Sequence, residues 1–383
     1  MKHYNYIFTG SGLSALMTVL KMVQSEKFND KTILLIDENS KNTNDRTWCF
    51  WEKPNGEFEA IVSKKWNNAL FANQKFRRDL DFQPYQYKMI RGLDFYNYVF
   101  DIISKQENIT FLNQKVIDFS DYESNVLIKT ETESFTCDKL FNSIYNPNLV
   151  KNQTKYPVLQ QHFIGWFIKS EQEVFFPEQA TFMDFSIPQN GNTKFMYVLP
   201  TSTTEALLEP TLFSHKHLKK EEYEAEIQTY AKKLGIINYE ITDTEQGSIP
   251  MTCYPFWKHN TKNVLNIGSA GGWTKASTGF TFMHTNKKAK KLVKFLQNDT
   301  LTALSMKSFE KKDKFWFYDL LFLDVLDKNN ALGSAVFSSL FKKGNPSLVL
   351  KFLDHETSFA EDLQIMLKCP KIPFIKALFG RIF

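Results

Sequence analysis

The pattern of apolar and polar residues in the first forty positions predicts a strand, a helix and a second strand. The first strand covers 4–9 (YNYIFT), the helix 16–25 (LMTVLKMVQS) and the second strand 31–37 (KTILLID). A Gly-rich turn at 10–15 joins the first strand to the helix. This order is that of a βαβ unit, the building block of parallel sheets that bind dinucleotides.

The residue types in this turn fit a diphosphate at the start of the helix. Gly10 can make the tight turn, Gly12 can let the backbone approach a pyrophosphate, and Ala15 is small enough for helix and strand to pack closely. Asp37 ends the second strand, where it is placed to accept a hydrogen bond from a ribose 2′-hydroxyl. The turn therefore predicts dinucleotide binding and leaves open whether the ligand is FAD or NAD.

A second, β-rich region follows. Residues 109–142 alternate as short strands and predict a small β-meander attached to the parallel sheet. The Asn- and Pro-containing stretch 145–157 predicts a boundary, and a charged amphipathic segment at 219–234 predicts a helix. Four further strands of an antiparallel or mixed, substrate-facing sheet are expected at 162–169, 180–185, 194–200 and 205–213.

The chain then returns to the opening pattern. Residues 263–267 predict a buried strand, which is followed by a turn with Gly268 and Gly271 and by a helix at 280–297. We therefore expect an α/β fold with a discontinuous, FAD/NAD(P)-binding Rossmann-like parallel sheet of the glutathione-reductase type, an inserted β-rich substrate domain and a helical C-terminal region. The expected boundaries are 1–155 with 245–300, 156–244, and 301–383.

Two segments of the helical region have distinct patterns. Residues 315–326 are apolar nearly all round and predict a packed helix. The tail, 371–383, mixes basic and large apolar residues. Such a tail could lie in a membrane interface or dock on the core of its own protein.

Composition excludes several classes of function. The chain has 383 residues, a net charge of +5 and no apolar run long enough to cross a bilayer. The N-terminus runs directly into a strand, so no signal peptide is expected, and the scattered lysines match no nucleic-acid motif. The four cysteines lie far apart, which predicts reduced thiols in a cytoplasmic protein. His215 and His217 lack a third ligand, so no metal site is expected.

Aromatic and basic residues suggest further contacts. The 36 phenylalanines could line a site for an apolar or cationic ligand, or reflect a codon bias that also favours Lys and Asn. Trp48, in the run 45–52, could cover a flat ring system or fill the core. Arg91 precedes a predicted helix, where it could pair with a phosphate or form a surface ion pair.

Taken together, several motifs in the correct order resemble the flavin-dependent lycopene β-cyclases of bacteria. The similar segments are 10–13 (GSGL), 46–50 (RTWCF), 182–184 (FMD), 195–200 (FMYVLP), 206–211 (ALLEPT), 245–250 (EQGSIP), 277–280 (STGF) and 371–373 (KIP). Two positions depart from the family pattern. Pro210 stands where the catalytic box has a second acid, and Ala276 stands where the flavin loop has a proline.

The resemblance implies an intramolecular lyase. Its reaction closes each ψ-end group of lycopene to a β-ring, through γ-carotene to β-carotene, by acid–base catalysis with no net redox change. It implies a reduced FAD, as a proton donor or as electrostatic support for a cation, with NAD(P)H as the reductant. The residues assigned to the cofactor are Gly10, Gly12, Ala15, Asp37, Trp48, Arg91, Gly268, Gly271, Thr278 and Gly279.

The resemblance also selects the catalytic acid. Glu209 follows three apolar residues, and burial would keep a carboxyl group protonated by raising its pKa. Glu205 shares a strand face with Leu207 and Glu209, which makes it a reserve acid. Phe182 or Trp48 could stabilise the carbocation by cation–π contact.

Other readings of the same sequence remain. A flavin monooxygenase or an isoprenoid-chain reductase could use this fold, and so could a non-enzymatic flavoprotein that binds carotenoid or lipid. For the cyclase, the expected partners are lycopene and related acyclic carotenoids, a membrane surface that supplies them, and other enzymes of the carotenoid pathway. No nucleic-acid partner is expected. We expect the protein at the cytoplasmic, inner face of the membrane.

Overall fold

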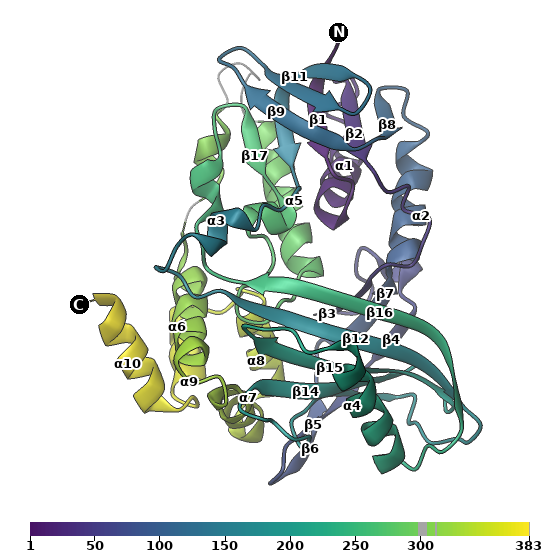
Figure 1. The fold of residues 1–383 in the computed structure, drawn as a ribbon, viewed down its shortest axis with the longest axis vertical. Coiled ribbons are helices and arrows are strands. Elements are labelled where there is room, and N and C mark those ends of the chain that lie inside the picture. The colour runs from purple at the N-terminus through teal and green to yellow at the C-terminus, as the bar shows by residue number, and fades with distance from the viewer. Residues whose placement is uncertain (298–304, 311, 383) are drawn as a thin grey trace.

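The computed structural model describes residues 1–297, 305–310 and 312–382, and its first layer is a sheet built on parallel strands (Figure 1). The strand order is β8-β2-β1-β11-β10-β9, and β17 pairs with β11. Four of these strands pair in parallel with β1 or with its neighbours, while β9 and β10 are antiparallel. The bounds are β1 (Lys2–Thr9), β2 (Ile33–Asp37), β8 (Ile109–Asn113), β9 (Val116–Asp121), β10 (Val126–Thr130), β11 (Ser134–Asn142) and β17 (Val264–Asn266).

Three helices cover one face of this sheet. They are α1 (Leu13–Ser25), α2 (Gly92–Ile103) and α5 (Phe282–Leu296). Alternate residues of β1 separate the two faces: Tyr6 and Phe8 pack with the helices, whereas Ile7 packs in a separate core with β10 and β11. Because β17 and α5 come from late in the chain, the predicted discontinuous Rossmann-like domain is confirmed.

The expected meander at 109–142 is partly wrong. Its first and last strands, β8 and β11, are members of the parallel part of the sheet. Only β9 and β10 form an antiparallel pair that continues from β11. Short alternating strands look alike in both arrangements, because the pattern within a strand does not reveal its partner.

The second layer is a mixed sheet in the order β16-β12-β15-β14-β13-β5-β6. The four predicted strands are present, and β16, β5 and β6 are additional members. Strands β5 and β6 come before the expected boundary at residue 155, and β16 extends across the expected boundary at residue 244. The sheet therefore crosses both expected domain boundaries. The bounds are β5 (Asn68–Ala72), β6 (Arg77–Asp81), β12 (Leu159–Ser170), β13 (Gln179–Asp184), β14 (Thr193–Pro200), β15 (Glu205–Ser214) and β16 (Tyr239–Met251).

A small sheet links the two layers. It has the order β3-β7-β4 and contacts α5 through β3. Helix α4 (Lys220–Lys233) covers the outer face of the second sheet, and α3 (Asn148–Lys151) lies in the connection between the two layers. The three strands are β3 (Thr47–Glu52), β4 (Lys64–Trp66) and β7 (Gln86–Arg91).

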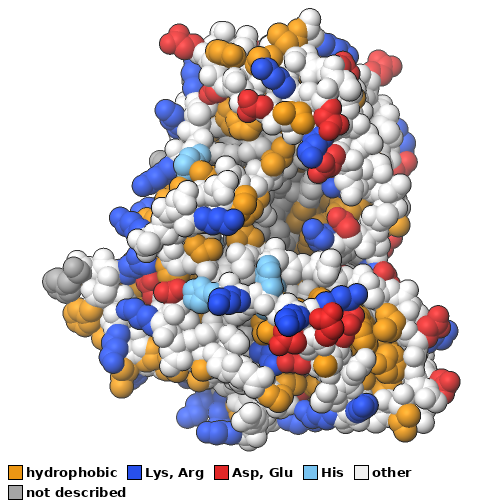
Figure 2. Space-filling model, viewed as in Figure 1, with side chains coloured by type: hydrophobic (Ala, Val, Ile, Leu, Met, Phe, Trp, Pro, Cys, Tyr) orange, Lys and Arg blue, Asp and Glu red, His pale blue; other side chains and the backbone are white. Residues whose placement is uncertain are grey.

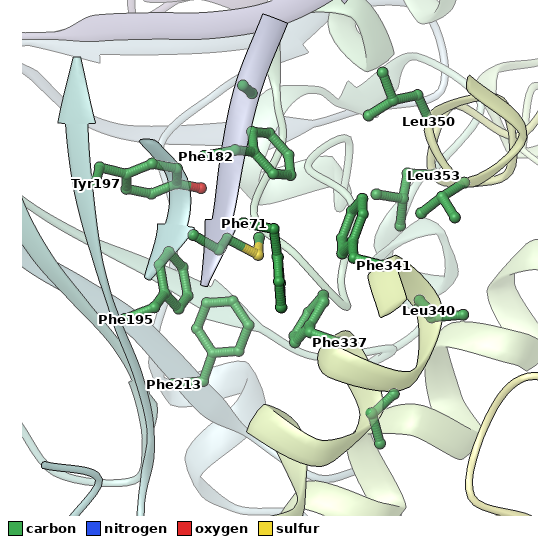
Figure 3. Packing of buried hydrophobic residues seen from close by; sticks show 14 of the residues in the cluster. Phe71, Phe182, Phe195, Tyr197, Phe213, Phe337, Leu340, Phe341, Leu350 and Leu353 are labelled. Atoms are coloured by element: carbon green, nitrogen blue, oxygen red, sulfur yellow. The ribbon is translucent and has the colours of Figure 1, made fainter. Parts of the chain in front are cut away.

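The C-terminal helices pack on the inner face of the second sheet. Phenyl rings from the sheet, such as Phe195 and Phe213, face Phe337 and Phe341 of α7 across a continuous aromatic core (Figure 3). Stacked and edge-to-face ring pairs fill this core, for example Phe71 with Phe341 at 5.0 Å between centroids. The helices are α6 (Lys314–Lys328), α7 (Leu332–Lys343), α8 (Pro346–Leu353), α9 (Phe359–Met366) and α10 (Lys371–Ile382).

The expected start of the helical region at residue 301 stays a prediction. The expected boundary between 300 and 301 lies outside the described residues, and the first long helix after it begins at Lys314. The tail helix α10 docks on α6, where Arg381 of α10 pairs with Asp324 of α6. No helix among the described residues is long and apolar enough to cross a bilayer.

Candidate active site

A cavity of about 350 Å³ lies between the two sheets, and the space-filling view is hollowed at this level (Figure 2). Segments that are remote in sequence form its walls. They are the N-terminus of α1, strands β3, β15 and β16, and the loop that precedes α5. The residues on which the following argument depends are Gly12, Trp48, Leu207, Glu209, Glu245 and Thr278.

The two glycines of the first turn have different roles. Gly10 has φ +88°, and a Cβ atom there would lie 2.2 Å from Ser143 Oγ, so the turn requires glycine. Gly12 lines the cavity, and a Cβ atom there would meet nothing within 4 Å. The open space in front of Gly12 adjoins the N-terminus of α1, where the backbone N–H groups and the helix dipole favour a phosphate.

Asp37 lies at the end of β2, as predicted, but its oxygens already have partners. Oδ2 accepts hydrogen bonds from the Ser11 backbone N–H at 2.6 Å and lies 3.2 Å from Lys41 Nζ. Oδ1 accepts from the Asn39 backbone N–H at 2.8 Å. In this structure Asp37 holds the glycine turn in place, and its contact with a ribose stays a prediction.

The two glycines of the late Gly-rich segment serve backbone packing, whereas a residue between them lines the cavity. A Cβ atom on Gly268 would lie 2.5 Å from Ser14 Oγ, and one on Gly271 would lie 2.2 Å from the Asn266 carbonyl oxygen. Neither glycine is part of the cavity wall, so both serve close backbone packing, and the neighbouring Ser269 lines the cavity instead. Ala15 is likewise fully buried in the core beside α1.

Two polar atoms in the wall have no partner within the described residues. They are Thr278 Oγ1 and Gln161 Oε1, both buried and both on residues that line the cavity. Gly279, with φ +72°, also lines it, and a Cβ there would collide with the Gln161 side chain at 1.7 Å. A buried polar atom without a partner is costly. These residues therefore fit a ligand with polar groups along its edge, as a flavin has.

Of the two remaining cofactor candidates, only Trp48 is part of the cavity wall. Trp48 lines the cavity and packs edge-on against Phe95 and Tyr96. Arg91 pairs with Asp243 at 2.5 Å, and its guanidinium lies 3.8 Å from the centroid of the Phe167 ring. Of the two alternatives for Arg91, the structure shows the ion pair. Its phosphate contact stays a prediction, and Arg46 is the arginine in the cavity wall.

Two carboxyl groups meet on the sheet side of the cavity. Glu209 projects from β15 and Glu245 from β16, and β12 runs between these strands. Gly165 of β12 pairs with Glu245, and a Cβ there would lie 3.3 Å from Glu209 Oε2 and 3.2 Å from Glu245 Cγ. The missing side chain at Gly165 leaves the space in which the two glutamates form a hydrogen bond.

The environment keeps Glu209 protonated. Burial raises the pKa of Glu209 well above its usual value, and the nearby charge of Glu245 raises this pKa further. Thr211 Oγ1 donates a hydrogen bond to Glu209 at 2.8 Å, which lowers the pKa but offsets the rise only in part. Burial also raises the pKa of Glu245, but the hydrogen bond from Thr47 and the charge of Arg91 oppose it. Glu209 therefore carries the shared proton and donates it to Glu245.

The reserve acid Glu205 is not brought to the site. It shares a strand face with Leu207 and Glu209, as predicted, but it lies at the end of β15. Its side chain is 46% exposed, and its carboxylate is 3.9 Å from Lys169 Nζ. Its carboxylate is not part of the cavity wall.

Sequence reasoning missed the role of Glu245. The segment 245–250 stands out as a motif, but β16 was not predicted, because its residues alternate between exposed and half-buried positions. The available signal was Gly165 inside the predicted strand 162–169, since a glycine inside a strand often marks a close approach. That signal becomes readable only when the register of β12 and β16 is known.

Aromatic and apolar groups form the rest of the wall. Tyr197, Leu199 and Leu207 come from the second sheet, and Phe280 comes from the loop before α5. Phe182, a predicted cation–π partner, is fully buried behind Phe280, and their rings are parallel with centroids 6.2 Å apart. Phe280 and Trp48 are therefore, with Tyr197, among the ring systems that line the cavity.

With this geometry in place, comparison with known proteins assigns the family. The family described as "Lycopene cyclase protein" matches residues 6–379. The chain belongs to this family. No curated protein sequence matches it significantly.

Solved structures share the fold. A geranylgeranyl bacteriochlorophyll reductase-like protein from Thermoplasma acidophilum aligns with TM-score 0.64 and 8% identity over 98% of both chains. A flavoprotein/dehydrogenase from Cytophaga hutchinsonii gives TM-score 0.64 and 10% identity over 96% of this chain and 99% of that one. The halogenase PltM in complex with FAD gives TM-score 0.60 and 10% identity over 97% of this chain and 87% of that one.

The raised pKa of Glu209 predicts how stability depends on pH. A group whose pKa is higher in the folded state stabilises the protein fully below its unfolded pKa of about 4.3. This contribution is lost as pH rises through the folded value. The stability of the wild type relative to Glu209→Gln should therefore fall as pH rises above the unfolded pKa, by at most about 1.4 kcal/mol per pH unit. Urea unfolding at several pH values, followed by tryptophan fluorescence, measures this difference.

The matched control is Glu205→Gln, which removes an exposed carboxylate from the same strand. Its stability difference from the wild type should change little with pH. Parallel pH profiles for the wild type and Glu209→Gln would mean that the carboxyl at 209 is ordinary and ionised.

Proposed function

We propose that the protein is a lycopene β-cyclase, which converts each ψ-end group of lycopene to a β-ring by way of γ-carotene. The observation that carries this proposal is the protonated, buried carboxyl of Glu209, held by Glu245 in a cavity that also reaches the glycine turn. An isomerisation of this kind needs a proton donor that stays protonated at neutral pH in dry surroundings, and no net electron transfer. A protonated carboxyl group in an apolar cavity meets that need.

Glu209 would donate its proton to the terminal double bond of the ψ-end. The second double bond then closes on the cation, a carbon–carbon bond forms, and loss of one ring proton restores neutrality. One proton is added and one is removed, so product and substrate are isomers. Glu245 is hydrogen-bonded to Glu209, so it is placed to accept the ring proton or to return a proton to Glu209.

This arrangement also explains the departure at Pro210. The family pattern has a second acid directly after the first, and this chain has proline there. Neighbouring residues of a strand point to opposite faces, so an acid at 210 would face away from Glu209. Here the second carboxyl group comes from β16 across the sheet, and it faces the same cavity.

The aromatic wall would stabilise the cation and exclude water. The rings of Phe280 and Trp48 line the cavity, and a ring face attracts a positive charge. Trp48 is itself fixed by Phe95, Tyr96 and Phe282. A ring that other rings hold in place keeps its orientation when the charge develops.

The residues on the opposite wall fit FAD. Gly12 and the N-terminus of α1 would hold the pyrophosphate, and Thr278, Gly279 and Gln161 would meet the polar edge of the flavin. When bound and reduced, FAD supplies an electron-rich ring beside the developing positive charge. NAD(P)H is proposed only as the source of that reduction.

The central prediction concerns Glu209→Gln, which keeps the shape of the side chain and removes its acidic proton. Expressed in a lycopene-accumulating host, the wild type should form β-carotene, and the variant should lose about 10²–10⁴-fold in cyclisation rate. Chromatography of extracted pigments measures the outcome. Glu205→Gln is the control on the same strand and should retain activity, because its carboxylate lies outside the cavity.

Two results would contradict the proposal. Full cyclisation by a folded Glu209→Gln protein would show that another group delivers the proton. Consumption of NAD(P)H in proportion to product, with a change in hydrogen or oxygen content, would favour a reductase or a monooxygenase on the same fold.

The paired glycines predict separable effects on flavin and on folding. Gly12→Ala places a methyl group in the open space by α1, so flavin content should fall while thermal stability is nearly unchanged. Gly10→Ala should lower stability by about 1–3 kcal/mol, because it combines a positive φ with a clash at Ser143. Flavin absorbance per chain and thermal unfolding measure both. Equal loss of stability in the two variants would argue against a ligand at Gly12.

A further inference from the structure

Helices α9 and α10 expose one apolar face each. On α9 and its C-terminal end these residues are Phe359, Leu363 and Leu367, spaced four apart. On α10 they include Ile372 and Ile375, of which Ile372 is 68% exposed. Residues at these spacings lie on one side of a helix. Large side chains in water over two adjacent helices form a patch of a kind that soluble surfaces rarely carry without a function.

The charged groups of this patch that have no ion-pair partner among the described residues are basic, because Glu361 of α9 pairs with Lys351 and the buried Asp362 pairs with Lys314. The segment 363–382 contains Lys368, Lys371, Lys376 and Arg381 and no Asp or Glu. The three lysines are exposed, whereas Arg381 pairs with Asp324 of α6. That ion pair and the buried Ala377 fix the inner side of α10 on the protein. The helix lies at the edge of the molecule (Figure 1), and the apolar residues of its other side are exposed.

An almost wholly apolar groove of about 320 Å³ leads inward from the patch. Leu367 and Ile375 stand at its outer end and belong to the exposed face. Phe337 and Leu340 of α7 line its wall, and Thr278 lines it as well. Thr278 is also a wall residue of the cavity that contains Glu209. The groove and the active-site cavity therefore adjoin at Thr278.

We propose that the α9–α10 surface binds the face of an anionic lipid bilayer, and that the groove passes the end of the substrate from the bilayer to Glu209. The second part rests on the proposed function, whereas lipid binding does not. A basic, apolar helix surface is the chemistry of an interfacial helix, which lies in the plane of the headgroups. At 1.5 Å per residue, α10 has a length of about 18 Å, too short to span the hydrocarbon core.

A second copy of the chain fits this surface less well. A symmetric dimer would place the same patch against itself, and like charges would meet across the contact. Lys368, Lys371 and Lys376 would then repel one another, and the acids of α9, Glu361 and Asp362, are already paired with Lys351 and Lys314. An anionic headgroup layer supplies the opposite charge. Charge complementarity therefore favours the bilayer.

The first experiment measures vesicle binding without any carotenoid. The full-length protein is sedimented with vesicles of phosphatidylcholine alone and of phosphatidylcholine with phosphatidylglycerol. The wild type should bind the anionic vesicles, and salt should weaken the binding. The triple variant Leu367→Ser, Ile372→Ser, Ile375→Ser should bind at least about tenfold more weakly.

The matched control removes three exposed apolar residues elsewhere, by the substitutions Ile117→Ser, Phe176→Ser and Ile237→Ser. It should bind vesicles like the wild type. Equal weakening of both variants, or no binding by the wild type, would overturn the membrane surface. A dimer in solution that only the first triple variant abolishes, without vesicle binding, would also overturn it in favour of a second copy.

The second experiment tests the groove with two substitutions on one helix. Ile375→Trp narrows the groove mouth, whereas Ile372→Trp adds the same ring to a neighbouring exposed position that does not line the groove. Both should bind vesicles, and only Ile375→Trp should lose most conversion of vesicle-borne lycopene. Equal conversion by the two would overturn the passage. Vesicle binding with no cyclisation by the wild type would leave the surface standing and refute the cyclase function.

Discussion

The protonated state of Glu209 is the constraint on which the site depends. A carboxylate is poorly solvated in a dry cavity, and a second carboxyl group in contact with it cannot ionise at the same time. The protein meets both conditions by placing Glu209 and Glu245 on two strands with Gly165 between them. Hydroxyl groups from Thr211 and Thr47 complete the hydrogen bonding, so the pair is buried and still holds its proton.

The location of this pair follows from the path of the chain. The chain forms most of the parallel sheet, builds the second sheet, and returns to the first through β17 and α5. The seam between the sheets therefore has a phosphate-type turn on one wall and an acid pair on the other. The C-terminal helices close the second sheet and form the apolar groove that adjoins this seam at Thr278.

Much of this architecture could be predicted, because burial on one or both faces leaves a pattern in each segment. The strands around Tyr6, Leu208 and Leu265 are apolar enough to read directly, and the turn at Gly10 has a signature of its own. Strand β16 could not be read in this way, since it alternates between half-buried and exposed residues. Strands β5 and β6 are short, and only their partner β13 makes them part of the second sheet.

The sequence by itself determined the local elements, the glycine turn and Glu209 as an acid in an apolar strand. The tertiary structure alone decided that Glu245 meets Glu209, that Glu205 lies in water, that Gly268 and Gly271 serve packing, and that Asp37 holds the turn. The physical reason is that periodicity within a segment reports which face is buried. The register between strands far apart in the chain sets which side chains share that face, and no single segment encodes it.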